Sequence, residues 1–336
     1  MNNVAIITPF FNTENYIEKC IENILSQKDI SLQYFLVDDG STDKSSALAR
    51  FYQKKDKRVT LIRTHNQGQG LARNIGIKLA DAEYIYFMDS DDYLETEYTL
   101  SALYDFAEHN KLDICSPMVL MKYFDNPLEC IPCLPCKSQF IKFPIIKKYG
   151  LLQPNISSGQ DGVFSHLVLT RCTRIGMSNQ ARFFYTSKRD GSTFLKHLKM
   201  HDKAFSIIKS HYSFILEYYD KNNLWKDNAL RLLKFMEKET FPNRLRPHFK
   251  YFTKEQKVFC IIYLKSIIDK AISFLDNDKK DFLMPNLLDI SKLNNYNISN
   301  ISDEYLNNII YNDYIIKHIS NDNILNEFGV ICKLSL

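Results

Sequence analysis

The chain has 336 residues, of which 45% are hydrophobic and 24% are charged, so we expect a globular protein with one large and one smaller domain. Its net charge of +4 is too small to create the field that nucleic-acid binding needs, so no nucleic-acid partner is expected. No segment approaches the about 20 apolar residues of a membrane span. Met1 runs into a strand-like segment without a signal-peptide pattern, which predicts a cytoplasmic location.

The first 125 residues alternate apolar, β-branched runs with amphipathic segments. This alternation predicts a mostly parallel sheet with right-handed helical crossovers, an α/β layer fold, in which ligands bind beyond the carboxyl ends of the strands. The predicted strands cover residues 4–11, 33–37, 59–63, 84–88 and 113–120, and the predicted helices cover residues 13–27, 43–54, 68–80 and 96–109.

The rest of the chain has a different character. Residues 140–193 are irregular apart from a predicted helix at 163–169, and long aromatic-rich helices are predicted from 205 to 275. Residues 226–270 carry eleven Lys and Arg against five Asp and Glu, a net +6, whereas residues 271–336 have a net −4. A basic aromatic helix could lie on an anionic membrane. We favour the alternative, in which the aromatic residues form the core of a helical domain.

Cysteines at positions 130, 133 and 136 are spaced as CxxCxxC. They could bind zinc with Cys115 as a distant fourth ligand, but the usual paired spacing is absent. The prolines between them favour a stiffened loop with reduced thiols, and the sequence leaves metal binding by these cysteines open.

The first acidic cluster, Asp38-Asp39-Gly40-Ser41, follows a predicted strand. A carboxylate at this edge of the sheet can accept a hydrogen bond from a nucleobase imide N–H or a ribose hydroxyl. Alternatively, Ser41, Thr42 or Asp43 caps the next helix. Both interpretations can hold, because the capping residues follow the acidic pair.

The second cluster, Asp89-Ser90-Asp91-Asp92, ends another apolar strand. Crowded carboxylates repel one another, and a divalent cation removes this conflict. Mg²⁺ or Mn²⁺ typically binds one or two carboxylates together with substrate phosphates. This cluster therefore predicts a metal–diphosphate site, although a solvated acidic turn before a helix is the simpler alternative.

A glycine-rich segment, residues 66–76, lies between the two clusters. Gly68 and Gly70 permit close backbone approach, and a helix N-terminus followed by Arg73 is suited to an anion. The segment lacks the third glycine of a dinucleotide-binding fingerprint.

Four motifs in this order resemble family 2 glycosyltransferases of the GT-A fold, the inverting bacterial type that builds surface polysaccharides. The matching stretches are VAIITPFFNTENYIEKCIENILSQ, FLVDDGSTD, NQGQGLARNIGIKLADAEYIYFMDSDD and the SGQDGVF segment at 158–164. The resemblance covers residues 3–195. It implies a GT-A catalytic domain at 1–200 and a smaller α-helical domain at 201–336, which would serve dimerisation, membrane association or acceptor binding.

The resemblance also implies roles for residues of the donor site. Phe11 would stack on the base and Asp39 would accept the uracil N3–H, which favours a UDP donor. Arg73 would lie near the diphosphate, Asp89 would touch the ribose or the metal, and Asp91 would bind Mn²⁺ or Mg²⁺. The remaining nucleotide-sugar-binding residues implied by the family pattern are Pro9, Asn66, Gly68, Ser90 and Arg189.

The family's general base lies in a Gly-Glu-Asp motif at the start of a helix. Asp161 matches this base, whereas Gln160 replaces the usual glutamate that shapes the acceptor site. An N-cap role is the structural alternative for Asp161. His197 and His201 are candidates for the downstream histidine that joins the metal in some GT-A enzymes, and a lone surface histidine is the commoner alternative.

These features predict an inverting, metal-dependent enzyme. It would move a hexose or N-acetylhexosamine from a UDP-sugar to a hydroxyl of a bacterial surface glycan, such as lipopolysaccharide, capsule or a lipid-linked oligosaccharide. The expected partners are the UDP-sugar, the glycan or glycolipid acceptor, the inner-membrane surface and a second copy of the chain. Two alternatives are a non-catalytic nucleotide-sugar-binding scaffold and a response-regulator-like phosphate pocket, although Arg63, not aspartate, ends the third predicted strand.

Overall fold

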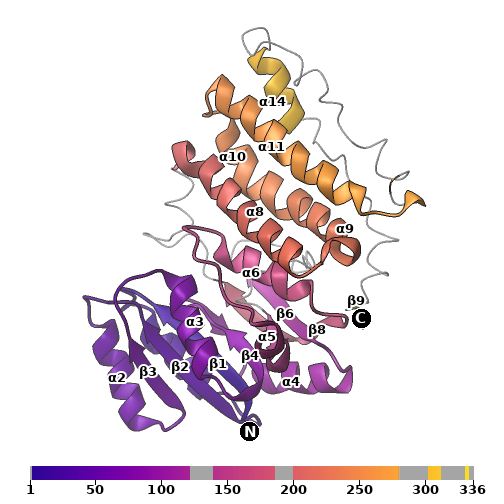
Figure 1. The fold of residues 1–336 in the computed structure, drawn as a ribbon. Helices are drawn as coiled ribbons and strands as arrows, with labels where there is room; N and C mark the ends of the chain where they lie inside the picture. Colours follow the sequence, from indigo (N-terminus) through magenta and orange to yellow (C-terminus); the bar gives the residue numbers. More distant parts are fainter. Residues whose placement is uncertain are drawn as a thin grey trace. The chain divides into compact units, whose positions relative to one another are not determined.

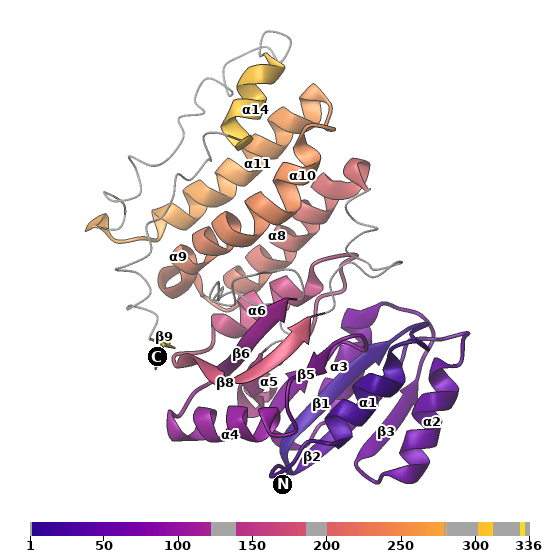
Figure 2. The same ribbon diagram turned by 180° about the vertical axis from the view of Figure 1, so that it is seen from behind.

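The computed structural model describes residues 2–121, 139–185, 200–278, 280, 302–311 and 330–332. The chain divides into two compact units, one formed by residues 1–189 with 324–336 and the other by residues 190–323. The sequence predicts the domain boundary at 200/201. Figure 1 shows the α/β unit and the helical unit, and Figure 2 shows them from behind.

The α/β unit is built on one sheet, in which the described residues form nine strands in the order β3-β2-β1-β4-β7-β6-β8-β5, with β9 paired to β8. Five of the strand pairs are parallel and three, β4–β7, β6–β7 and β5–β8, are antiparallel. The predicted α/β fold class is therefore confirmed. The strands are β1 (Asn2–Phe10), β2 (Leu32–Asp38), β3 (Val59–Arg63), β4 (Ala82–Phe87), β5 (Tyr93–Leu94), β6 (Ile114–Met121), β7 (Phe140–Lys142), β8 (Ile175–Tyr185) and β9 (Val330–Cys332).

Helices cover both faces of this sheet, which explains why β1 is apolar on both sides. Val4 and Ile6 of β1 pack in the core with residues of α1, α2 and α4. Ile7 faces α3 instead, where a Cβ added to Gly76 would lie 2.7 Å from its side chain. The helices are α1 (Ile17–Leu25), α2 (Ser45–Lys55), α3 (Gln69–Leu79), α4 (Thr99–His109), α5 (Phe143–Tyr149) and α6 (Gln160–Leu169).

The strand order places a topological switch point at β1. Strands β2 and β3 extend the sheet on one side of β1, whereas β4 lies on the other side. Ligands of open α/β sheets bind beyond the carboxyl ends of the strands at such a point. Asp39 follows β2 and Asp89 closely follows β4, so both acidic turns lie at the edge where a ligand is expected.

The helical unit contains a buried aromatic core. The side chains of Tyr212, Tyr219 and Phe241 are fully buried, and the Tyr212 hydroxyl is 2.6 Å from Thr240 Oγ1. Of the basic segment 226–270, Phe241 belongs to this core, whereas Tyr251 and Phe259 are exposed. None of the described helices is long and apolar enough to cross a membrane. The elements are η2 (His201–Lys203), α8 (Ala204–Lys221), α9 (Trp225–Phe235), the π-helical η3 (Met236–Leu245), α10 (Arg246–Phe249), α11 (Lys254–Ser273) and α14 (Asp303–Tyr311).

The segment that the sequence predicts to be irregular differs most from expectation. It contains β7, α5 and β8 in addition to the predicted helix. Strand β8 pairs in parallel with β6, and the register shifts between Pro117 and Met118. Strand β7 has three residues, too few to show a periodic pattern. These strands depend on pairing with distant partners, which local periodicity does not reveal.

Candidate active site

The turn after β2 is held by hydrogen bonds from backbone N–H groups. Asp38 Oδ1 accepts the N–H of Ser41 at 2.8 Å. Asp39 Oδ1 accepts the N–H of Gln67 at 2.9 Å, and Asp39 Oδ2 accepts the N–H of Gly68 at 2.8 Å. Asp39 therefore fastens the glycine-rich loop to the carboxyl end of β2.

The Asp39 carboxyl combines burial with strong hydrogen bonding. Burial raises its pKa above the ordinary 3.8, and the two backbone N–H groups of Gln67 and Gly68 offset only part of this effect. An ionised carboxylate has about four lone-pair sites, so two accepted hydrogen bonds leave further acceptor capacity. The carboxylate of Asp39 can therefore accept a nucleobase N–H without releasing the loop.

The loop between β1 and α1 is fixed to the same turn. The N–H of Asn12 donates to Ser41 Oγ at 3.1 Å, and the N–H of Thr42 donates to Asn12 Oδ1 at 2.8 Å. Phe11, immediately before Asn12, is 43% exposed, which leaves its ring accessible to a planar ligand. Pro9 is buried near the end of β1. The pairing of β1 with β4 ends at Ile7, so the missing N–H of Pro9 removes no hydrogen bond to β4.

The capping alternative for this turn also has a counterpart in the structure. Asp43 Oδ1 accepts the N–H of Ser45, the first residue of α2, at 3.0 Å. Asp43 Oδ2 accepts the N–H of Glu14 at 3.0 Å. The N-cap of α2 is Lys44, whose side chain forms no capping hydrogen bond, so the capping prediction for Ser41, Thr42 or Asp43 is met only in that Asp43 accepts the first N–H of α2.

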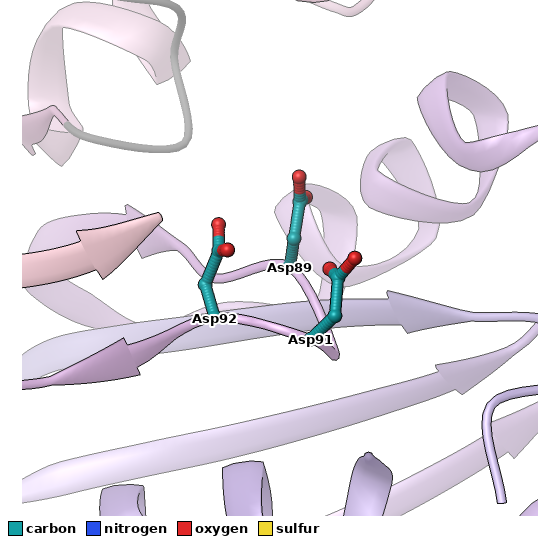
Figure 3. Close-up of side chains that lie close together, drawn as sticks. All are labelled: Asp89, Asp91 and Asp92. Carbon is teal, nitrogen blue, oxygen red and sulfur yellow. The ribbon is translucent and has the colours of Figure 1, made fainter. Parts of the chain in front are cut away.

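The turn after β4 brings three carboxylates together. Asp89, Asp91 and Asp92 each offer an oxygen within 4.8 Å of the others, and Figure 3 shows the three side chains pointing to the same side of the turn. Oxygens bound to one octahedral Mg²⁺ at about 2.1 Å lie at most about 4.2 Å apart. Small side-chain movements would therefore let these oxygens share one cation, and the donor set fits Mg²⁺ or Mn²⁺.

The electrostatics of this turn are consistent with a cation site. The Arg73 guanidinium donates to Asp89 Oδ1 at 2.6 Å, and the Arg73 side chain is only 1% exposed. Burial first, and then the carboxylates of Asp92 and Asp91, raise the pKa of the Cys20 thiol to about 12. The carboxylates of Asp91 and Asp92 therefore act as negative charges on this buried neighbour.

Helix α3 connects the two acidic turns. Its N-cap is Gly68, whose N–H binds Asp39, and its fifth residue is Arg73, which pairs with Asp89. Asn66 and Gly68 are exposed in the loop before this helix, whereas Ser90 is buried in the second turn. The structure thus brings the predicted residues of both turns to the N-terminal half of one helix.

Asp161 lies in the first turn of α6 and is half-buried. The N-cap of α6 is Gly159, which has a positive φ of 72°, so the N-cap alternative for Asp161 does not describe this helix. Its neighbour Gln160 contacts α3, since a Cβ added to Gly70 would lie 2.9 Å from Gln160 Cγ. The predicted base is therefore adjacent in sequence to a residue that packs on α3.

Two further contacts, one with the segment before α6 and one with α6 itself, were not predicted from the sequence. The side chain of Asn74 forms two hydrogen bonds with the backbone of Gln153, at 3.0 Å and 2.8 Å. The ring of Phe164 in α6 meets the ring of Phe87 in β4 edge to face, with centroids 5.7 Å apart. An Asn inside the predicted helix at 68–80 was the available signal for the first contact, because Asn is disfavoured in helix interiors.

The remaining predicted residues lie elsewhere or outside the described residues. His201 belongs to the helical unit, where its Nδ1 is 2.9 Å from His248 Nδ1 and its ring stacks on Tyr251 at 3.7 Å. Cys115 is buried in β6, and burial raises the pKa of its thiol to about 12. Arg189, His197 and the cysteines at 130, 133 and 136 lie outside the residues that the structure describes.

Comparison with known proteins identifies the class. Residues 5–145 match the family model Glycosyl transferase family 2. The matched range contains both acidic turns and α3, and this part of the chain belongs to glycosyltransferase family 2. The predicted family is therefore confirmed.

Curated relatives are bacterial. The uncharacterized glycosyltransferase EpsJ of Bacillus subtilis is 42% identical over 111 residues, which are 33% of this chain and 32% of that protein. The poly(ribitol-phosphate) beta-glucosyltransferase of Bacillus spizizenii is 30% identical over 208 residues, which are 56% of this chain and 33% of that protein. The chain thus spans about a third of the length of these relatives.

Solved structures share the fold at low identity. TarS from S. aureus, residues 1–349, in complex with UDP-GlcNAc has a TM-score of 0.53 at 16% identity, covering 81% of this chain and 90% of that one. A mannosyltransferase from Pyrobaculum calidifontis in complex with GDP-Man and Mn²⁺ has a TM-score of 0.52 at 16% identity, covering 80% and 86%. At this identity the likeness establishes the GT-A fold.

Proposed function

We propose that this protein is an inverting glycosyltransferase that moves a hexose or N-acetylhexosamine from a UDP-sugar to a hydroxyl of a bacterial surface glycan. One observation carries the proposal. The N-terminal half of α3 and its N-cap contact Asp39, Asp89 and Gln160, so the residues proposed for the nucleotide and the diphosphate and the neighbour of the proposed base meet at one helix.

The donor is proposed from the first turn and from the solved neighbours. Asp39 offers carboxylate oxygens as acceptors, and the loop with the exposed Phe11 ring is hydrogen-bonded to the same turn through Asn12 and Ser41. Such a pair is suited to stacking a base and accepting its imide N–H. Uracil has such an N–H, and the TarS structure contains UDP-GlcNAc. The helix N-terminus at Gly68 adds a partial positive charge toward an anion.

The second turn is the proposed cation site. Asp91 would hold Mn²⁺ or Mg²⁺ with Asp89 or Asp92, because these carboxylates converge. When bound, such a cation neutralises charge on the donor diphosphate. Arg73 holds Asp89 in place through its ion pair and adds a fixed positive charge at this edge of the sheet.

Asp161 is the proposed general base. Its carboxylate would take the proton of the acceptor hydroxyl as that oxygen attacks the anomeric carbon from the face opposite UDP. The bond from the anomeric carbon to the UDP oxygen breaks, and its electron pair leaves with the diphosphate. Transfer by one displacement inverts the anomeric configuration.

The acceptor class and the site of action rest on the relatives. The poly(ribitol-phosphate) beta-glucosyltransferase of Bacillus spizizenii and TarS of S. aureus are named for poly(ribitol-phosphate), a polymer that carries hydroxyl groups. We therefore propose a hydroxyl-bearing surface polymer as acceptor, in place of a nucleic acid or protein. Contact of the helical unit with the membrane surface or with a second copy remains part of this proposal.

Substitution of the base tests the proposed reaction. Asp161→Asn should lower kcat by about 10²–10⁴-fold, because general-base assistance is lost, while the UDP dissociation constant stays within about twofold. UDP release from a panel of UDP-sugars with Mn²⁺ measures turnover, and calorimetry measures UDP binding. Asp105→Asn, an exposed aspartate of α4, is the matched control.

The same assay separates the alternatives. A scaffold would bind UDP and release none from any donor, and a phosphate-receiving pocket would bind UDP no better than inorganic phosphate. Wild-type turnover in Asp161→Asn would remove Asp161 from the mechanism.

A further inference from the structure

We infer that Asn74 and Gly70, both on α3, are positioning residues that set the general base against the donor site. The inference rests on the proposed function, since it assigns the base to Asp161. It adds residues that contact neither donor nor acceptor in the proposed reaction. The geometry that supports it lies entirely within the α/β unit.

Asn74 acts as a backbone substitute for the segment before α6. Its Nδ2 donates to the carbonyl oxygen of Gln153 at 3.0 Å, and its Oδ1 accepts the N–H of Gln153 at 2.8 Å. A primary amide offers the same donor and acceptor as a peptide group. The pair of bonds therefore replaces a strand neighbour for Gln153, and both residues are more than nine-tenths buried.

The second contact lies directly beside the base. Gly70 faces Gln160, and an added Cβ would meet Gln160 Cγ at 2.9 Å and Gln153 Cβ at 3.5 Å. A Cβ contact shorter than about 3 Å requires a neighbour to move. Gln160 Cγ is one bond beyond Cβ, and Gln160 precedes Asp161, so a displacement of Gln160 that reaches its backbone moves the base.

A third contact fixes the helix at a later turn. Phe164 packs edge to face on Phe87, which ends β4 next to the second acidic turn. The aromatic contact holds the body of α6, whereas Asn74 and Gly70 hold its start. Helix α3 thus carries residues for both sides of the reaction, with Arg73 on Asp89 and its neighbour Asn74 on Gln153.

This arrangement predicts a particular kinetic signature. Loosening the contact should misplace Asp161 and leave the donor site intact. A displacement of about 1 Å in a reacting group can cost about 10²-fold in rate. Changes at Gly70 or Asn74 should therefore lower kcat while the dissociation constant for UDP changes little.

A double-mutant cycle tests the Gly70 contact. Gly70→Ala alone should lower kcat by about 10²-fold. Gln160→Ala removes the Cγ that the new methyl group meets, so Gly70→Ala should cost less than about threefold when introduced into the Gln160→Ala protein. Lys78→Ala, an exposed side chain of α3, serves as the control and should leave kcat unchanged. An equal loss from Gly70→Ala in both backgrounds would overturn the inference.

Asn74→Ala provides a second test of the inference, in which amide hydrogen exchange is measured as well as turnover. It should lower kcat with UDP affinity kept, and it should speed amide hydrogen exchange at Gln153 and in the first turn of α6. Unchanged kcat and unchanged exchange would contradict the positioning role while Asp161→Asn still abolished transfer. If the wild type releases UDP from no donor, the proposed function fails, and exchange at residues 153–161 still decides whether α3 holds this segment.

Discussion

The two acidic turns have similar sequences and similar positions in the sheet, but their carboxylates have different partners in the folded protein. Both follow parallel strands that flank β1, and both contain adjacent aspartates. In the first turn, Asp38 and Asp39 accept hydrogen bonds from backbone N–H groups of Ser41, Gln67 and Gly68. In the second turn, three carboxylates converge within 4.8 Å, and Arg73 pairs with Asp89.

The difference shows how position along one sheet edge can assign separate tasks to the same residue type. Backbone donors fix the first turn whether or not a ligand is present, so Asp39 is preorganised for a neutral base. The second turn concentrates negative charge, which a cation relieves. The first turn should therefore bind nucleotide without metal, and the second should make binding depend on metal.

The largest effect is expected in the second turn. Asp91→Asn should lower turnover by at least about 100-fold, because even outer-shell partners of a metal contribute 10–100-fold to its affinity. The gain in UDP affinity on adding Mn²⁺ should disappear, whereas the weaker affinity measured with EDTA should be unchanged. Calorimetry with and without Mn²⁺ measures this difference, with Asp105→Asn as control. A metal response equal to that of wild type would place the cation elsewhere.

A smaller effect, with a pH signature, is expected in the first turn. Burial raises the pKa of Asp39, so its carboxylate is ionised above that raised value and protonated below it. Metal-free UDP affinity should fall as the pH drops through it, by about 10–150-fold if one hydrogen bond to the charged group is lost. The midpoint should lie above the ordinary 3.8.

The contribution of Asp39 to folding stability should change with pH in the direction opposite to its contribution to UDP affinity. A folded-state pKa above that of the unfolded chain means that the folded protein binds the proton more tightly. The contribution of Asp39 to stability is therefore greatest at low pH and is lost as the pH rises through its raised pKa. Acid loss of UDP binding would then not reflect unfolding caused by Asp39. Asp39→Asn should remove this step from the binding profile, and UDP's own titration cancels between the two proteins.

Much of this comparison could be predicted from the sequence. The strand at Val59–Arg63 was predicted with its observed bounds, and both acidic turns were placed at strand ends. Apolar runs that end in aspartates carry this information locally. The sequence could not reveal that Arg73 pairs with Asp89, because two distant residues must meet for that contact to form.

The base-bearing part of the site was less predictable for the same reason. Asp161 was identified by its motif, whereas the contact between Asn74 and Gln153 joins positions 79 residues apart. Strands β7 and β8 also escaped prediction, since their pairing with β4 and β6 depends on tertiary context. Chemistry-bearing residues were therefore easier to find than the contacts that position them.

The smallest expected effect separates two glycines around the first turn. Gly40 and Gly68 have positive φ values of 85° and 94°, so alanine is strained at both. At Gly40 an added Cβ would also lie 3.0 Å from the backbone nitrogen of Asn66, whereas at Gly68 nothing lies within 4 Å. Strain of this kind costs about 1–3 kcal/mol. Gly40→Ala should therefore lower the urea midpoint of the full chain more than Gly68→Ala does. At Gly40 the added methyl group meets backbone atoms, which cannot move aside easily, whereas at Gly68 it meets open space. Equal shifts for the two variants would mean that the first turn yields to the added methyl group and is not the rigid partner in the comparison.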